Sequence, residues 1–324
     1  MIVGVDLYCG LGGLTHGLLR GGVQVAAGVD VDPECRFPYE RNNSTRFIEA
    51  DVRRLRGADL QALWGRGNAT LLAGCAPCQP FSSYSRTAPN RQDEKWQLVA
   101  DFGRLVREST PDLVTVENVP QLADHDVFHD LLATLDRYHV WWEIVQCVDY
   151  GVPQTRRRLV LLASRGGAIS LLPADSTAGR GPVTVRRTIS HLPPLAAGEA
   201  DAADPVHSVP SLSDLNVRRI RASRAGGTWR DWPEELRASC HRRGTGETYP
   251  SVYGRMEWDA PAPTITTQCF GYGNGRFGHP EQDRAISLRE AAMLQTLPET
   301  YQLVAPGQRP RFSILGRLIG NAVP

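Results

Sequence analysis

A thiol stands out first among the side chains of this sequence that could do covalent chemistry. Two cysteines lie in a Gly-Cys-Ala-Pro-Cys-Gln-Pro-Phe-Ser segment over residues 74–82, directly after a short apolar run. The Cys-x-x-Cys spacing is shared by redox pairs and by half of a zinc site. No second cysteine pair is present, and the segment continues as a loop where a redox motif would enter a helix. We therefore interpret Cys78 as a nucleophile and Cys75 as the buried end of a strand, and we expect no metal ion.

A carboxyl group and three arginines further along the chain also lie next to apolar runs. Glu117 ends the apolar run 113–116, and a Gln-Thr-Arg-Arg-Arg run over 154–158 precedes another apolar run. A glutamate at a strand end is as often a helix cap or a salt-bridge partner, and a basic run can be no more than solvated surface. However, ligands of open α/β sheets bind at the carboxyl ends of the strands. A thiol and a carboxyl group there would combine covalent with acid–base catalysis, and arginines would bind oxygens of a base or phosphate.

A glycine-rich turn over residues 6–13, Asp-Leu-Tyr-Cys-Gly-Leu-Gly-Gly, closes the first apolar run and opens a helical pattern. Glycines let the backbone turn tightly and approach a ligand at a helix N-terminus. Asp30 follows the next apolar run, where a carboxylate can bind ribose hydroxyls, and Asp51 could reach an adenine edge. The simpler alternative is a tight turn with acids that cap helices. Because no phosphate-binding Gly-Lys-Thr/Ser motif is present, the pattern favours a nucleoside without phosphates.

The elements that must position these residues alternate between strand and helix, which predicts an α/β fold with a doubly wound, mostly parallel sheet. The predicted strands are 2–8, 23–30, 70–73, 113–116, 144–148 and 159–163, with a further strand before Asp51. The predicted helices are 13–20, 34–42, 92–108 and 127–138.

Residues 165–286 have a different character. They are rich in Gly, Pro, Ser and Arg, show little helical periodicity, and are too many for a loop in a compact domain. Order returns at Ser287, where Ser-Leu-Arg-Glu is a capping-box sequence that predicts a helix to about Gln295. We expect a catalytic domain of residues 1–164 and 287–324, and a smaller irregular domain of residues 165–286.

The charge distribution and the cysteines narrow the class of protein. Residues 1–151 carry 14 basic and 20 acidic side chains, whereas residues 152–260 carry 16 and 11. A basic middle segment suits a nucleic-acid partner. Seven cysteines at irregular spacing do not indicate a disulfide framework, and no apolar run approaches the roughly 18 residues of a membrane span. We expect a cytoplasmic, nucleoid-associated protein.

Taken in order, these segments resemble the motif set of the cytosine-5 DNA methyltransferase family of bacterial type. The glycine turn, the Pro-Cys-Gln loop, Glu-Asn-Val over 117–119 and Gln-x-Arg-x-Arg over 154–158 are followed by Arg-Glu-Ala-Ala over 289–292 and Gly-Asn at 320–321. The resemblance runs from Asp6 to Pro324, and residues 165–286 correspond to the variable target-recognition region. It implies a Rossmann-like methyltransferase fold and S-adenosylmethionine as cofactor.

The resemblance assigns residues to the cofactor. Tyr8 would stack near it, Asp30 would take the ribose hydroxyls, Val31 would pack on adenine, and Asn321 would close the site. The other residues that it places at the cofactor are Asp6, Gly10, Leu11, Gly12, Gly13, Asp51, Val52 and Pro77.

The resemblance also implies the reaction. Cys78 would add to carbon 6 of a flipped-out cytosine in a specific duplex DNA site, while Glu117 bonds ring nitrogen 3 and Arg158, helped by Arg156, holds the cytosine oxygen. The methyl group then passes to carbon 5. The residues expected to contact the substrate are Gln79, Ser82, Asn118 and Gln154. Such an enzyme modifies DNA alone or beside a restriction endonuclease that acts on the same site.

Two other functions fit parts of the sequence. A tRNA cytosine methyltransferase of the same family is suggested by Cys269-Phe270, but Gly271 stands where that branch has Thr. A catalytically silent DNA-binding relative would not need Cys78 and Glu117 intact. In the family a helix usually follows Gly-Asn-x-Val-Pro and packs on the sheet, so we expect a chain that ends at Pro324 to be less stable.

Overall fold

A computed structural model describes residues 1–77, 92–174, 181–242 and 251–324. The chain divides into two compact units. The first contains residues 1–146, 157–173 and Val323, and the second contains residues 147–156, 174–322 and Pro324. The catalytic domain of residues 1–164 and 287–324 that we expect from the motifs stays a prediction.

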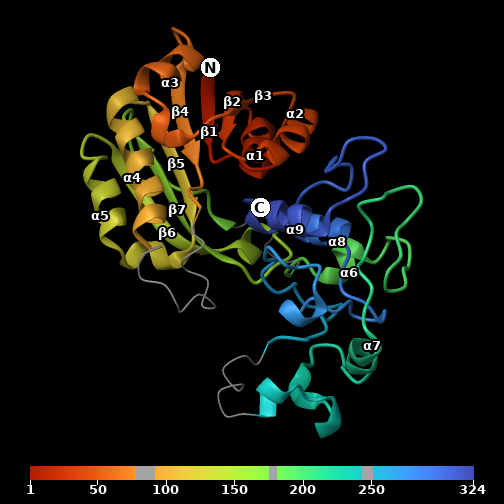
Figure 1. Cartoon of the computed structure of the whole chain (residues 1–324). Helices are drawn as coiled ribbons and strands as arrows, with labels where there is room; N and C mark the ends of the chain where they lie inside the picture. Colours follow the sequence, from red (N-terminus) through yellow and green to blue (C-terminus); the bar gives the residue numbers. More distant parts are fainter. Residues whose placement is uncertain (78–91, 175–180, 243–250) are drawn as a thin grey trace. The chain divides into compact units, whose positions relative to one another are not determined.

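The first unit is built on a seven-stranded sheet (Figure 1). Its strand order is β3-β2-β1-β4-β5-β7-β6, and the strands from β1 to β5 pair in parallel while β7 is antiparallel to both of its neighbours. The bounds are β1 (Ile2–Leu7), β2 (Gln24–Asp30), β3 (Arg46–Glu49), β4 (Ala69–Gly74), β5 (Leu113–Asn118), β6 (His139–Gln146) and β7 (Arg157–Ser164). This confirms the predicted doubly wound, mostly parallel α/β sheet.

Helices cover both faces of this sheet. Helix α1 packs on α2, whereas α3 packs on α4 and α4 on α5, and Figure 1 shows the two groups on opposite sides. The bounds are α1 (Gly13–Arg20), α2 (Arg36–Asn43), α3 (Gly57–Trp64), α4 (Gln92–Ser109) and α5 (Asp126–Ala133). The apolar runs of β1, β4 and β5 are buried between these layers, as expected for parallel strands covered on both faces.

Strand β6 begins earlier than predicted. The sequence analysis expected a strand over 144–148, but β6 is His139–Gln146, and Cys147 begins a 3-10 turn. The reason is its place at the edge of the sheet, where most of its side chains, including Val140, Trp142 and Ile144, are exposed. A strand that is not buried on both faces has no continuous apolar run to mark its start.

The second unit has short helices among long irregular segments. They are α6 (Val185–Ile189), α7 (Asp214–Arg221), α8 (Leu288–Leu294) and α9 (Phe312–Asn321). The predicted capping box is confirmed, because Ser287 accepts from the backbone N–H of Glu290 and the Glu290 carboxylate accepts from that of Ser287. A small core of Ile220, Trp229, Trp232, Leu236, Tyr272 and Ala285 lies beneath the loops that follow α7.

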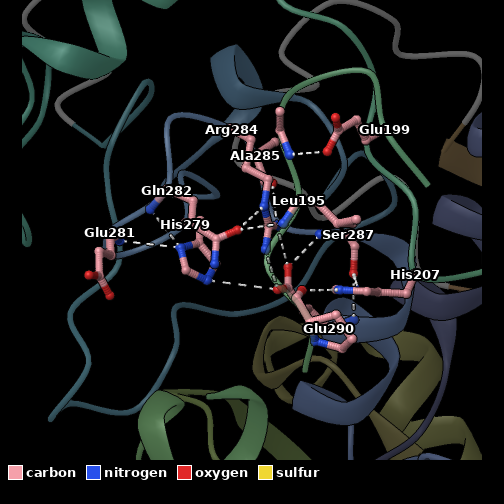
Figure 2. Close-up of polar contacts among 12 residues, drawn as sticks. Leu195, Glu199, His207, His279, Glu281, Gln282, Arg284, Ala285, Ser287 and Glu290 are labelled. Atoms are coloured by element: carbon pink, nitrogen blue, oxygen red, sulfur yellow. Dashed lines mark hydrogen bonds and ion pairs between the residues drawn. The ribbon is translucent and has the colours of Figure 1, made fainter. Parts of the chain in front are cut away.

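A buried network of hydrogen bonds joins irregular segments before and after α7 to the start of α8 (Figure 2). Arg284 donates to both oxygens of Glu290, at 2.7 and 2.8 Å. His207 donates through Nε2 to the carbonyl of Pro193, so its Nδ1 accepts from the hydroxyl of Ser287 at 2.9 Å. Backbone that has few ladder hydrogen bonds of its own is held in this unit by side chains.

No helix of the described residues is long and apolar enough to cross a membrane.

Candidate active site

The residues with predicted chemistry in the first unit lie where neighbouring parallel strands end. Leu7 of β1 pairs with Gly74 of β4, and Gly74 pairs with Val116 of β5. The chain therefore leaves the sheet at one edge with the glycine-rich turn after β1, Cys75 after β4, and Glu117 near the end of β5. This is the edge at which open α/β sheets bind their ligands.

Glu117 is held at both of its carboxyl oxygens. Arg158 Nε lies 2.9 Å from Oε1, a close charge contact without the alignment of a hydrogen bond, and the Cys75 thiol donates to Oε2 at 2.8 Å. The side chains of Glu117 and Arg158 are only 11% and 14% exposed. In such surroundings the ion pair is stronger than at an open surface. A carboxyl group with a fixed orientation beside a guanidinium can bind the edge of a planar ring.

The loop after β4 is tied to the end of β5. The Asn118 side-chain amide donates to the carbonyl of Ala76 at 3.2 Å, and its oxygen accepts from the backbone N–H of Val119 at 2.8 Å. Asn118 is 1% exposed, so the structure shows it as a tether for this loop. Pro77 is exposed at the last described position before the gap.

The predicted nucleophile Cys78 and the predicted substrate contacts Gln79 and Ser82 lie outside the described residues.

Asp6 is a fully buried carboxyl group at the end of β1. Its Oδ2 accepts from the hydroxyl of Thr15 at 2.7 Å, and Thr15 in turn lies 3.0 Å from the hydroxyl of Tyr39. Burial raises the pKa of Asp6 to about 7, although the bond from Thr15 lowers it. Its Oδ1 is buried and has no hydrogen-bond partner among the described residues. One acceptor is thus left over beside the glycine-rich turn.

The glycine-rich turn adopts left-handed backbone at three positions. Tyr8, Gly10 and Gly12 have φ angles of 59°, 52° and 96°, and Gly12 is the N-cap of α1. A non-glycine residue in this region is uncommon and occurs where the surroundings fix it; the Tyr8 hydroxyl donates to the carbonyl of Leu98 at 2.7 Å. A Cβ at Gly10 would meet nothing within 4 Å. The backbone there borders open space that a ligand could use.

Asp30 braces this turn from the end of β2. Its Oδ2 accepts from the backbone N–H of Gly10 at 2.9 Å and its Oδ1 from that of Asp32 at 3.0 Å. Burial raises the pKa of Asp30, although these two bonds lower it. Each carboxylate oxygen can accept about two hydrogen bonds, so both keep a site for a hydroxyl. The next side chain, Val31, is 67% exposed. Free acceptors beside an exposed apolar side chain fit a ribose and its base.

Four other residues that were predicted to contact the cofactor are buried in the core, bonded to a neighbouring residue, or in close contact with another backbone segment. The side chains of Leu11 and Val52 are buried, at 1% and 3% exposed, so only their backbone could face a ligand. The Asp51 carboxylate accepts from the backbone N–H and the guanidinium of Arg53. At Gly13 a Cβ would overlap the carbonyl oxygen of Val323, so a close approach of two backbone segments requires glycine there.

The remaining predicted site residues lie in the second unit. Gln154 is fully buried, with its amide nitrogen bonded to the carbonyl of Leu294 and to the Gln295 side chain. Its oxygen accepts from the backbone N–H of Ile265. Contact between Gln154 and a substrate would therefore require these bonds to break.

Arg156 differs from Arg158 in its surroundings. It is 3% exposed and donates to the carbonyls of Ile265 and Ala322, at 3.3 and 3.4 Å. These contacts lie within the second unit, whereas Arg158 contacts Glu117 in the first. Asn321 is exposed at the end of α9. The predicted roles of Arg156 and Asn321 at the substrate and cofactor stay predictions.

Residues 2–324 match the protein family of C-5 cytosine-specific DNA methylases. The chain belongs to this family. Its members methylate carbon 5 of cytosine in DNA, with S-adenosylmethionine as the general methyl donor. The chain is accordingly a DNA cytosine-5-methyltransferase, and the resemblance deduced from the motifs is confirmed.

Relatives of this methylase include bacterial modification enzymes. The Type II methylase M.HgiDII of Herpetosiphon aurantiacus is 52% identical, over 99% of this chain and 91% of its own length. The Type II methyltransferase M1.BsuMI of Bacillus subtilis is 30% identical, over 98% of this chain and 77% of its own length. These matches favour DNA modification of the restriction–modification type over the tRNA alternative.

Solved methyltransferase structures share the fold. The Entamoeba histolytica methyltransferase EhMeth matches with a TM-score of 0.67 at 14% identity, over all of this chain and 94% of the other. The S. pombe Dnmt2 methyltransferase matches with a TM-score of 0.62 at 16% identity, with the same coverage. At these identities the likeness concerns the fold.

Two contacts of candidate site residues were missed in the sequence. Cys75 was interpreted as the buried end of a strand, but it follows β4, is only partly buried, and its thiol donates to Glu117. Its position directly after a strand that neighbours β5 was the available signal, but a pairing of β4 with β5 cannot be read from spacing. Thr15, which bonds Asp6, carried no signal beyond its place in the first turns of a helix.

Proposed function

We propose that this methylase acts on a flipped-out cytosine in a specific duplex DNA site, through a transient bond between the Cys78 sulfur and carbon 6 of the ring. The observation that carries the proposal is the fixed carboxyl group of Glu117. It lies at the sheet edge beside Arg158 and directly adjoins the loop that leads to Cys78. Inside a duplex carbon 6 is out of reach, so the base must leave the stack, at a cost on the order of a few kcal/mol.

Glu117 and Arg158 prepare the ring for attack. Glu117 takes up a proton from solvent at Oε2 and donates it to ring nitrogen 3, which draws electrons from carbon 6. Arg158 is a planar donor suited to the cytosine oxygen, and its charge favours the ionised carboxyl group whenever the proton is on the ring. The Cys78 thiolate then adds to carbon 6, and carbon 5 becomes electron-rich.

S-Adenosylmethionine, when bound, supplies the methyl group. After carbon 5 has taken it, a base removes the carbon 5 proton, the bond from Cys78 to carbon 6 breaks, and nitrogen 3 returns its proton to Glu117. The thiolate is thus regenerated, and 5-methylcytosine and S-adenosylhomocysteine are released. The residues of this chain bind, orient and exchange protons, as general acid–base and nucleophilic catalysis require.

The glycine-rich turn and Asp30 form the proposed cofactor site. Support comes from the open space at Gly10, the free acceptor positions of Asp30 and the exposed Val31. Asp30→Ala should weaken S-adenosylmethionine binding about 10- to 100-fold, since a bond to a charged group contributes roughly 1.5–3 kcal/mol. Isothermal calorimetry measures this, with Glu49→Ala at the end of β3 as the control. Unchanged affinity in Asp30→Ala would make Asp30 a structural brace only.

The activity itself is tested by transfer of labelled methyl groups. The purified chain should label duplex DNA and leave tRNA unlabelled. Methylation-sensitive sequencing of DNA from cells that express the chain should show 5-methylcytosine in one sequence motif. Labelled tRNA with unlabelled DNA would overturn the proposal.

A restriction endonuclease that cuts the same site is the proposed partner in the cell. The supporting observation is that the similar bacterial proteins are named Type II methylases. Survival of cells that receive such an endonuclease should depend on expression of this chain.

A further inference from the structure

The thiol of Cys75 occupies a position that the proposed reaction does not yet use. It donates to Glu117 Oε2 at 2.8 Å, while Arg158 lies at Oε1. Cys75 directly follows β4, and the pairing of Gly74 with Val116 brings it beside Glu117. Each carboxyl oxygen therefore has a different neighbour, a permanent cation on one side and a neutral thiol on the other.

The two neighbours differ in how readily they can be replaced. A guanidinium is always charged and binds a carboxylate firmly, whereas a thiol is a weak donor. Because Oε1 faces the cation, Oε2 is the oxygen left for the ring of a substrate. In a side chain that is only 11% exposed, a carboxyl oxygen without any donor would be costly. A thiol satisfies that oxygen and costs little to displace.

We propose that Cys75 is a positioning residue for Glu117. Its thiol holds Oε2 in the orientation that meets ring nitrogen 3 of cytosine and gives way when the base arrives, with the proton remaining on sulfur. This inference rests on the proposed role of Glu117. It gives the first cysteine of the Cys-x-x-Cys pair a function that is separate from the nucleophile.

The test compares Cys75→Ala and Cys75→Ser with the unchanged enzyme in kcat, KM for DNA and the pH dependence of kcat. Cys75→Ala should lower kcat about 3- to 10-fold, the worth of one ordinary hydrogen bond, and leave KM for DNA within about twofold. The pH profile of kcat should also change, because the carboxyl group has lost one of its two neighbours. Cys75→Ser should restore most of kcat, because a hydroxyl also donates. Cys240→Ala removes an exposed cysteine of the second unit and should leave kcat and its pH dependence unchanged.

Glu117→Gln separates the inference from the function on which it rests. Adding Cys75→Ala to Glu117→Gln should lower kcat no further, because the thiol acts through the carboxyl group. Any of three results would overturn the positioning role and leave the proposed function intact. Cys75→Ala could lower kcat as much in Glu117→Gln as in the unchanged enzyme, the pH profile of kcat could stay unchanged in Cys75→Ala, or Cys75→Ser could fail to restore kcat. Normal activity of Glu117→Gln would overturn both.

Discussion

Asp6 is a buried carboxyl group whose pKa lies well above its ordinary value. Its carboxyl group is 1% exposed, and burial raises its pKa to about 7. A carboxyl group whose pKa is raised on folding stabilises the fold fully below its unfolded pKa near 4, and this contribution is lost as the pH rises toward 7. Without cofactor, the first unit should therefore lose stability over that window.

Asp6→Asn removes this dependence while it keeps an acceptor for Thr15. Relative to the unchanged chain, the variant should gain stability as the pH rises from 5 to 7, by at most about 1.4 kcal/mol per pH unit. Urea unfolding of both proteins at several pH values, without cofactor, measures the difference. A difference that stays constant with pH would show that Asp6 does not titrate in this range.

Single residues in the Gln-Thr-Arg-Arg-Arg run show what sequence can and cannot predict. The run indicated arginine donors, and Arg158 indeed contacts Glu117. Arg156 instead donates to backbone carbonyls within the second unit. Alternate residues point to opposite sides only in a regular strand, and β7 begins at Arg157. The orientation of Arg156 is set by the irregular segment before it, which spacing does not define.

Among the helices and strands, the most buried ones were predicted most closely from the sequence. The buried strands β1, β4 and β5 were predicted closely because each is a continuous apolar run, and α1 because its apolar residues follow the helical period. Helix α3 was not predicted, and β6 was displaced by several residues. Helix α3 is as short as α1 but much less amphipathic, and β6 is an exposed edge strand, so neither has a clear apolar pattern.

The start of α8 depends on the ion pair between Arg284 and Glu290. Burial alone would raise the pKa of Glu290, but the bonds and charge of Arg284 outweigh it and the pKa is lowered. Burial lowers the pKa of the neighbouring His279 to about 4, so at neutral pH Arg284 is the charge that balances Glu290. The pair lies at the centre of the network in Figure 2.

Glu290→Gln should destabilise the protein by about 3–5 kcal/mol, because it leaves the Arg284 charge buried without a counter-charge. Glu281→Gln, an exposed glutamate on the same segment, is the control and should change stability by less than about 0.5 kcal/mol. Replacing both partners, as Arg284→Met with Glu290→Leu, should recover much of the loss. Chemical denaturation measures all three, and equal stability of Glu290→Gln and the control would contradict the account.

At the scale of the whole molecule, the chain combines a regular sheet unit with an irregular one. Residues 165–286 were predicted to be a separate domain because they lack periodicity, and the family resemblance implied that this domain recognises the target. In the structure they lie mostly in the second unit with few helices. Phosphate contacts position a protein on DNA, and base-edge contacts specify the sequence. We propose that residues 165–286 supply the base-edge contacts that choose the DNA site, and that the residues of the reaction lie outside them.

Grafting residues 165–286 onto a related methylase of different specificity should transfer the methylated sequence. Methylation-sensitive sequencing of DNA from cells that express the hybrid shows which motif is modified. The ungrafted relative, expressed in the same cells, is the control. A hybrid that is active but modifies the relative's original motif would place specificity elsewhere in the chain.

The covalent bond to Cys78 is the central claim, and trapping on 5-fluorocytosine tests it most directly. A duplex that carries 5-fluorocytosine at the methylated position should form a complex with the enzyme that survives denaturation when S-adenosylmethionine is present, because fluorine cannot leave carbon 5 as a proton does. Cys78→Ala should form none, while Cys75→Ala should still form the complex, more slowly. A complex that persists in Cys78→Ala, or that is abolished by Cys75→Ala alone, would contradict the account.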